Sequence, residues 1–137
     1  MIWSLNGKRI ASVSSTVLEG AMTIERIQPG PIMSAAVVHG DTVYLAGLIA
    51  ADLDVGTKAQ TEQILAKIDE LLAAAGSDKS KLVKANIWLT DIGEWSLMNE
   101  AWSAWIVPGA TPARATVEAR LAAAKARVEI MVEAARD

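Results

Sequence analysis

Hydrophobic and polar residues alternate along two stretches near the C-terminus, within the segment 111–133. The first run puts small or apolar residues on one face and polar residues on the other: Ala113, Ala115, Val117, Ala119 and Leu121 against Arg114, Thr116, Glu118 and Arg120. The second run repeats the pattern, with Val128, Ile130, Val132 and Ala134 against Arg127, Glu129, Met131 and Glu133. A period of two is typical of a half-buried strand, although Ala, Glu, Arg and Lys also favour helix. Because both runs keep this period and Pro112 interrupts any helix from upstream, the pattern predicts two strands.

Earlier strands are indicated by shorter apolar runs. Residues 23–27 alternate weakly before the turn cluster Pro29 to Pro31. Residues 35–38 and 43–49 predict a β-hairpin, in which Gly40 and Asp41 supply the turn. The single histidine, His39, lies at this turn and is interpreted as a solvated turn residue rather than a catalytic base. Residues 82–90 alternate again, with Val83, Ala85, Ile87 and Leu89 on one face and Lys84, Asn86, Trp88 and Thr90 on the other.

Two helices are predicted between these strands. The first begins near Gly56, with Thr57 as its expected N-cap, and ends at Gly76. Its apolar residues recur at helical spacing: Ile64, Ile68, Leu71 and Leu72. The second runs from Asp91 to about Ile106 and carries a stripe formed by Trp95, Met98, Asn99, Trp102 and Trp105. This stripe is interpreted as packing against the sheet rather than as a platform for stacking nucleic-acid bases.

The order of elements is strand, hairpin, helix, strand, helix, strand, strand, which predicts an α+β domain. Two helices can cover one face of such a sheet, and nothing else in the chain remains to cover the other face. Trp88 and Met131 are expected on that second face, so we expect it to contact another subunit.

Composition narrows the class of protein. The chain of 137 residues is 52% hydrophobic and 21% charged, which predicts one domain with apolar surface left for oligomer contacts. A formal net charge of −3 and a pI near 5.2 count against nucleic acid as a partner. Cysteine is absent and histidine occurs once, which excludes thiol catalysis, disulfides and a histidine-rich metal site.

The N-terminal residues are set apart from the predicted domain. Residues 1–21 are expected to be a leader or an extra edge strand, and residues 22–137 a single domain. These first residues lack a long apolar segment of the secretory kind, and no stretch has the roughly 18 apolar residues of a membrane span. We therefore expect a soluble, cytoplasmic protein without membrane contact.

Arg114 and Glu129 are the main candidates for chemistry. The Arg114 guanidinium could hold a substrate carboxylate through charge-assisted hydrogen bonds worth about 1.5 to 3 kcal/mol each, or it could pair with Glu118 or another carboxylate in a subunit contact. Glu129 could orient or deprotonate a water molecule, or serve as a solvated strand residue or an ion-pair partner. If the last two strands form a simple hairpin, Glu129 falls opposite Ala119, roughly 17 Å from Arg114. A shared site then requires two subunits or another strand order.

Three segments carry a family resemblance: AGLIA at 46–50, TPARATVE at 111–118 and VEIMVEA at 128–134. Together they resemble the Rid family, the YjgF-like reactive-intermediate deaminases that are also called L-PSP endoribonucleases or translation inhibitors. The resemblance implies a chorismate-mutase-like α+β fold, assembled as a homotrimer with two helices on one face of each sheet and sites in clefts between subunits. It also implies cofactor-free hydrolysis of a 2-imino acid, or its enamine tautomer, to a 2-oxo acid and ammonia.

The same resemblance assigns roles to individual residues. Arg114 matches the carboxylate-binding arginine, Glu129 the water-positioning glutamate and Asn99 a recurrent asparagine. Thr116 stands where the deaminases often have cysteine, and Gly47 is the glycine of a Ser-Gly-Gln segment. Thr116, Asn99 and Gly47 are therefore expected to bind substrate together with Arg114.

Four positions depart from the deaminase pattern. Ile32 and Met33 follow the Gly30-Pro31 pair where a tyrosine is usual, and Ala46 and Leu48 replace the serine and glutamine beside Gly47. These changes imply a more apolar pocket and a pattern similar to a YoaB-like branch. They favour, as an alternative function, a non-catalytic trimer that binds small carboxylates. An endoribonuclease ranks third because the chain has an acidic pI and no basic stripe.

Overall fold

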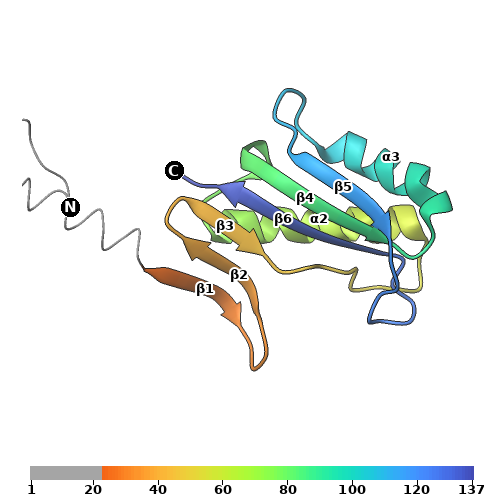
Figure 1. Ribbon diagram of the computed structural model, residues 1–137, viewed down its shortest axis with the longest axis horizontal. Coiled ribbons are helices and arrows are strands. Elements are labelled where there is room, and N and C mark those ends of the chain that lie inside the picture. The colour runs from red at the N-terminus through yellow and green to blue at the C-terminus, as the bar shows by residue number, and fades with distance from the viewer. Residues whose placement is uncertain (1–22) are drawn as a thin grey trace, which may run out of the picture.

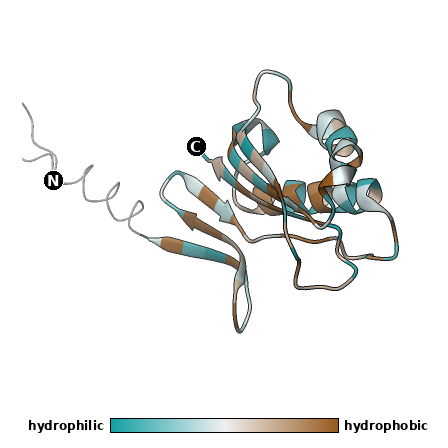
Figure 2. Ribbon diagram, turned by 45° about the vertical axis from the view of Figure 1, so that its right-hand side comes forward, coloured by the Kyte–Doolittle hydropathy of each residue, from teal (hydrophilic) through white to brown (hydrophobic). Residues whose placement is uncertain are grey.

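One mixed sheet with two helices on the same side makes up the domain (Figures 1 and 2). The computed structural model describes residues 23–137, so the expected leader or extra strand at 1–21 lies outside the described residues. The strand order is β1-β2-β3-β6-β4-β5, and the helices are α2 (Thr57–Ala74) and α3 (Trp95–Trp105). The strands are β1 (Ile24–Pro29), β2 (Ser34–His39), β3 (Thr42–Leu45), β4 (Leu82–Leu89), β5 (Ala113–Glu118) and β6 (Val128–Ala135). The predicted element order and α+β class are confirmed.

The hydrophobic core lies between this sheet and α2. Ile64, Ile68 and Leu71 recur along one face of the helix and are fully buried. Alternate residues of β6 are buried on the facing side of the sheet: Val128, Ile130, Val132 and Ala134. The period-two pattern at the C-terminus thus forms a strand in the middle of the sheet rather than a helix.

The helix ends differ slightly from those expected. The N-cap of α2 is Gly56, and Thr57 is the first helical residue, with its hydroxyl donating to Glu94 Oε1 at 2.9 Å. Gly76 has a φ of 79° just beyond the end of α2, a conformation that glycine adopts at little cost. Asp91 caps a short 3₁₀ turn, Ile92–Glu94, by accepting from the Gly93 N–H, so that α3 begins only at Trp95.

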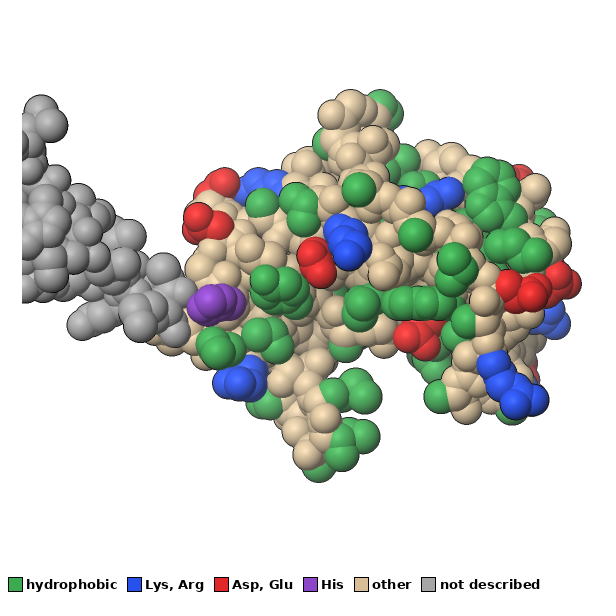
Figure 3. All heavy atoms as spheres, in the orientation of Figure 1, with side chains coloured by type: hydrophobic (Ala, Val, Ile, Leu, Met, Phe, Trp, Pro, Cys, Tyr) green, Lys and Arg blue, Asp and Glu red, His purple; other side chains and the backbone are tan. Residues whose placement is uncertain are grey.

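The β1–β2 hairpin extends away from the rest of the domain, as Figure 1 shows. Hydrophobic side chains gather at its tip (Figure 3), where Ile32 is 88% exposed and Met33 is 63% exposed. The next turn, between β2 and β3, is the two-residue turn at Gly40 and Asp41, with His39 exposed beside it. Two of the four departures from the deaminase pattern therefore lie on a projecting tip.

Of the arrangements that the sequence leaves open for the last two strands, the simple hairpin does not form. β4 lies between β5 and β6, parallel to β5 and antiparallel to β6. The chain passes from β4 through α3 to β5, and such a helical crossover joins parallel strands. A bulge between Leu82 and Lys84 also turns Val83 outward, so Leu82 takes the buried position expected for Val83.

The sheet face opposite the helices, here called the open face, is partly apolar (Figure 3). The register of the strands places Tyr44, Trp88, Val117, Glu129 and Met131 on it. Tyr44, Val117 and Met131 are among the exposed large hydrophobic residues. The expectation that Trp88 and Met131 lie on the face without helices is confirmed.

Candidate functional site

Arg114 lies on the helix-covered side of β5 and is held by α3. Its register partner is the buried Ala85, and its Nη1 donates a hydrogen bond to Asn99 Oδ1 at 2.9 Å. Glu118 is not its partner, because that carboxylate accepts from the Ile92 N–H at 3.0 Å. Among the described residues, Arg114 has no carboxylate partner. Its remaining N–H groups are therefore available to an anionic ligand.

Two tryptophan rings flank the Arg114 guanidinium. Its Cζ lies 5.2 Å from the centre of the Trp102 ring and 5.9 Å from that of Trp95. Both distances are within the range of cation–π attraction. Burial lowers the pKa of Arg114 from its ordinary value, yet arginine stays charged at neutral pH. The predicted tryptophan stripe thus contributes to the site as well as to the core, where Met98 and Trp102 are buried.

Thr116 follows Arg114 on the same side of β5. Its register partner is the buried Ile87, and its Oγ1 is buried without a hydrogen-bond partner among the described residues. A hydroxyl in that state has unused hydrogen-bonding capacity. The structure therefore brings three of the predicted residues together: Arg114, Asn99 and Thr116.

Glu129 forms a second cluster with Gly47. The segment after β3 runs beside β6, where Leu48 and Ile130 exchange backbone hydrogen bonds of 2.9 and 3.0 Å. This pairing places Gly47 against the Glu129 side chain, where a Cβ on Gly47 would lie 3.2 Å from the carboxyl carbon and would overlap Oε2. The Glu129 carboxylate has no hydrogen bond or ion pair within residues 23–137. It is half-buried on the open face, close to the sheet backbone.

The replacement at Leu48 does not alter the surroundings of Glu129. The Leu48 side chain packs against the hydrophobic core rather than beside the carboxylate. Ala46 is half-buried and donates its N–H to Ala35 O. The more apolar pocket expected from the four departures stays a prediction.

The two clusters of one chain lie on opposite faces of the sheet. Arg114 is level with Ala85, whereas Glu129 is level with Trp88 and two strands away from β5. Three residues along the strand and two strand spacings put their backbones roughly 14 Å apart. This strand order, with β4 between β5 and β6, does not bring both residues to one small substrate within one chain.

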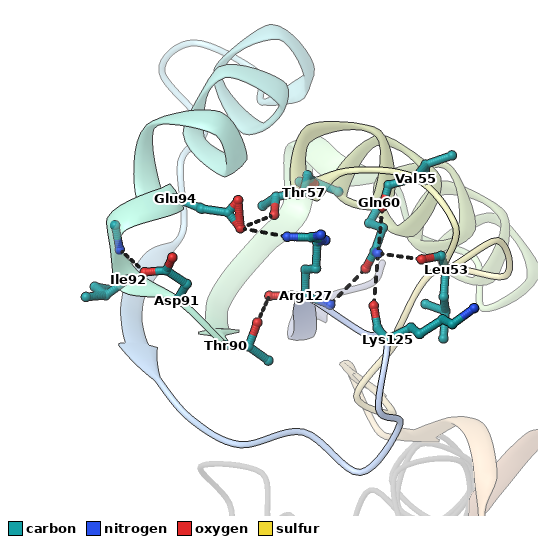
Figure 4. Close-up of polar contacts among 12 residues, drawn as sticks. Leu53, Val55, Thr57, Gln60, Thr90, Asp91, Ile92, Glu94, Lys125 and Arg127 are labelled. Carbon is teal, nitrogen blue, oxygen red and sulfur yellow. Dashed lines mark hydrogen bonds and ion pairs between the residues drawn. The ribbon is translucent and has the colours of Figure 1, made fainter.

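A polar network at the start of α2 was not identified from the sequence (Figure 4). Gln60 is fully buried; its Nε2 donates to the carbonyls of Leu53, Val55 and Lys125, and its Oε1 accepts from the Arg127 N–H. Glu94 accepts from Thr57 and pairs with Arg127 at 3.3 Å. A buried glutamine in an amphipathic helix gives no signal of this role in the sequence.

This network borders a surface hollow of about 620 Å³ that includes Asp54, Lys125 and Arg127. Both cations there are paired, Lys125 with Asp54 and Arg127 with Glu94. We assign it a structural role because its charges are balanced. In the described part of the chain, no group of three or more His, Cys, Asp or Glu side chains could hold a metal ion. Neither described helix is long and apolar enough to cross a membrane.

The sequence and the fold agree with a known family. The family model described as Endoribonuclease L-PSP matches residues 23–136. The chain belongs to this family, the Rid or YjgF family, as the resemblance predicted.

Individual relatives support this assignment. The RutC family protein YoaB of Escherichia coli is 42% identical over 114 residues, which are 83% of this chain and 99% of that protein. The crystal structure of a YjgF-family protein from Neisseria meningitidis has a TM-score of 0.82 at 42% identity, covering 85% of this chain and 98% of the other. Reactive Intermediate Deaminase A of Arabidopsis thaliana is 31% identical over 71% of this chain and 54% of that protein.

Proposed function

We propose that this protein hydrolyses small 2-imino acids, or their enamine tautomers, to 2-oxo acids and ammonia. The observation that carries the proposal is the Arg114 guanidinium, oriented by Asn99 and free of any carboxylate among the described residues. A guanidinium with free N–H groups in one plane suits a carboxylate, which it can bind through two parallel hydrogen bonds. The similarity to a protein named as a reactive intermediate deaminase supports this substrate class.

Hydrolysis requires a water molecule aimed at C2 of the bound imine. Glu129 is suited to this role because its carboxylate is half-buried and unpaired in the described part of the chain. It accepts a proton from the water as the new C–O bond forms to an imine that is already protonated on nitrogen, which becomes the amino group of a tetrahedral intermediate. The Glu129 carboxyl then returns this proton to the nitrogen, the C–N bond breaks and ammonia leaves. The hydroxyl proton passes to the Glu129 carboxylate and on to ammonia as the carbonyl of the 2-oxo acid forms. These steps use only the substrate, water and the two side chains.

The site is proposed to lie between two subunits of a homotrimer. One chain presents Arg114, Asn99 and Thr116 beside α3, and presents Glu129 and Gly47 on the opposite side of the sheet. Two copies with the open face of one turned toward β5 of the next would unite the clusters. The exposed apolar residues of the open face, among them Val117 and Met131, support a contact of this kind.

The experiment compares 2-oxo acid release from 2-iminobutyrate, generated in situ, with and without the protein. Arg114→Ala should lower kcat/KM by about 100-fold, since the lost ion pair contributes roughly 3 kcal/mol. Arg120→Ala removes an exposed arginine two residues after β5 and is the matched control, with activity expected to be unchanged. Equal rates with and without protein would exclude this reaction.

A carboxylate-binding protein without turnover is the second candidate. Ile32 and Met33 favour it, because they occupy the tip position where the deaminases usually have tyrosine. In that case the unaltered chain binds 2-oxobutyrate without accelerating imine hydrolysis, and Arg114→Ala abolishes the binding. An endoribonuclease is not favoured, because a formal net charge of −3 offers little attraction for RNA.

A further inference from the structure

Three residues of α3 surround the Arg114 guanidinium from one side. Trp95, Asn99 and Trp102 follow each other at intervals of four and three residues, which places them on one stripe of the helix. Asn99 bonds the guanidinium, and the two rings lie 5.9 and 5.2 Å from its central carbon. A cation with one amide partner and two aromatic neighbours has a restricted orientation.

The two rings differ in what else they can contact. Trp102 is only 6% exposed, and its ring packs against that of Trp105 with centres 5.4 Å apart. Trp95 is 42% exposed at the first position of α3, so much of its ring has no neighbour within residues 23–137. Trp102 can only support the guanidinium, whereas Trp95 also has free surface for a ligand.

The carbon chain of a ligand bound to Arg114 can run along the exposed ring of Trp95 or away from it. A carboxylate bound side-on lies near the plane of the guanidinium, and the carbon chain attached to it continues from the same place. Trp95 is the exposed aromatic residue beside that guanidinium, and its large, rigid ring gains free energy when apolar carbon covers it. An apolar side chain on the ligand can therefore be bound beside the ion pair.

We propose that Trp95 determines the specificity of this site by contacting the side chain of the acid whose carboxylate Arg114 binds. The preferred ligands are 2-imino or 2-oxo acids with a branched apolar side chain, such as those with the carbon skeleton of leucine, over those with the skeleton of alanine. This inference rests on the proposed function, which identifies the ligand as a 2-imino or 2-oxo acid. It adds which side chain of that acid the site prefers.

The test measures kcat/KM for 2-imino-4-methylpentanoate and for 2-iminopropionate, both generated in situ. The unaltered chain should favour the first, and Trp95→Ala should reduce that ratio by about tenfold, the smallest effect usual for lost apolar contacts in a pocket. Trp95→Phe should keep most of the preference, because phenylalanine retains an apolar ring. Leu97→Ala, an equally exposed position of α3, is the control and should leave the ratio unchanged. A ratio that stays the same in Trp95→Ala would overturn the inference.

A binding measurement separates this inference from the proposed function. Calorimetry gives the dissociation constants of pyruvate and 4-methyl-2-oxopentanoate for the same variants. If the unaltered chain binds both acids but does not turn over the imines, the deaminase proposal fails, and a tenfold loss of affinity preference in Trp95→Ala still supports the role of Trp95. If the imines are hydrolysed with no preference lost in Trp95→Ala, the deaminase proposal stands and the inference is wrong. Absence of binding and turnover for every acid overturns both.

Discussion

Gly47 shows how one residue without a side chain sets the position of a functional group. Its backbone lies against the Glu129 carboxylate, so any Cβ at this position would overlap Oε2. The half-buried Glu129 can swing away from such a contact, which moves the carboxylate rather than unfolding the protein. This movement should affect the rate of catalysis more than the free energy of unfolding. A shift of about 1 Å in a reacting group can cost about 100-fold in rate.

We therefore expect Gly47→Ala to lower kcat for imine hydrolysis by about 100-fold, while the free energy of unfolding changes by about 1 kcal/mol or less. Steady-state kinetics and urea denaturation measure the two effects separately. Gly56→Ala is the control, since a Cβ at Gly56 meets nothing within 4 Å. If Gly47→Ala retained the original kcat, Glu129 would not need its observed position.

At the scale of residues, the sequence predicted which side chains lie near one another better than it predicted their surroundings. Arg114 and Asn99, both predicted site residues, are joined by a hydrogen bond, and Thr116 lies on the same side of β5. Trp95 was assigned to packing, since periodicity cannot tell a buried stripe from its exposed first member. Gln60 was missed because its hydrogen bonds join segments up to 67 residues apart.

At the scale of elements, Gln60 links the start of α2 to the loop that precedes β6. Its side chain makes four hydrogen bonds to the backbone: to Leu53, Val55 and Lys125 carbonyls and from the Arg127 N–H. None of these four backbone groups belongs to a strand ladder. Secondary structure in the described chain therefore gives them no other hydrogen-bond partner. This amide therefore fixes the loop from which β6, with Glu129, begins.

Gln60→Ala should lower the free energy of unfolding by about 3 kcal/mol, because it removes a fully buried side chain and four part-buried hydrogen bonds. Gln63→Ala is the matched control on the same helix. Gln63 accepts one hydrogen bond, from the Asp52 N–H, and its loss should cost about 1 kcal/mol or less. Urea midpoints at one fixed protein concentration compare the variants. Equal midpoints for the two variants would show that water replaces the Gln60 amide at little cost.

The sequence leaves the order of the last strands open, because a simple hairpin is one of the arrangements that it allows. A strand, a helix and a strand in succession, as in 82–118, favour a parallel crossover, and β5 pairs with β4 rather than with β6. Alternation fixes which residues share a face of one strand, but it does not fix the neighbour of that strand or the side that the helices cover. In β5 the helices lie on the side of Arg114 and Thr116, while Val117 is 48% exposed on the open face.

For the whole molecule, the consequence is a chain that carries the two halves of the proposed site on opposite sides of its sheet. The Arg114 cluster faces α3, and Glu129 lies on the open face with Trp88, Val117 and Met131. The Arg114 cluster offers a cation for the substrate carboxylate but no base for the water. The Glu129 cluster offers that base but no cation. In a closed ring of identical subunits, every chain could supply one half to each of its two neighbours.

Mixed assemblies test this arrangement directly. Arg114→Ala, with its kcat/KM about 100-fold lower, and Glu129→Gln should each show very little activity alone. When the two variants are unfolded together in equal amounts and refolded, about a quarter of the intersubunit sites should combine an intact Arg114 with an intact Glu129. We therefore expect about a quarter of the original 2-oxo acid release, because the two side chains of each restored site come from different chains.

The control replaces Glu129→Gln in the mixture with the double variant Arg114→Ala/Glu129→Gln. No subunit then carries Arg114, so refolding should restore nothing, although the assemblies form as before. Light scattering establishes that both mixtures reach the same mass. If the first mixture assembles but regains no activity, the two residues do not act across a subunit boundary. Since the sheet separates them within one chain, that result would also remove Glu129 from the reaction and leave Arg114 as a binding residue alone.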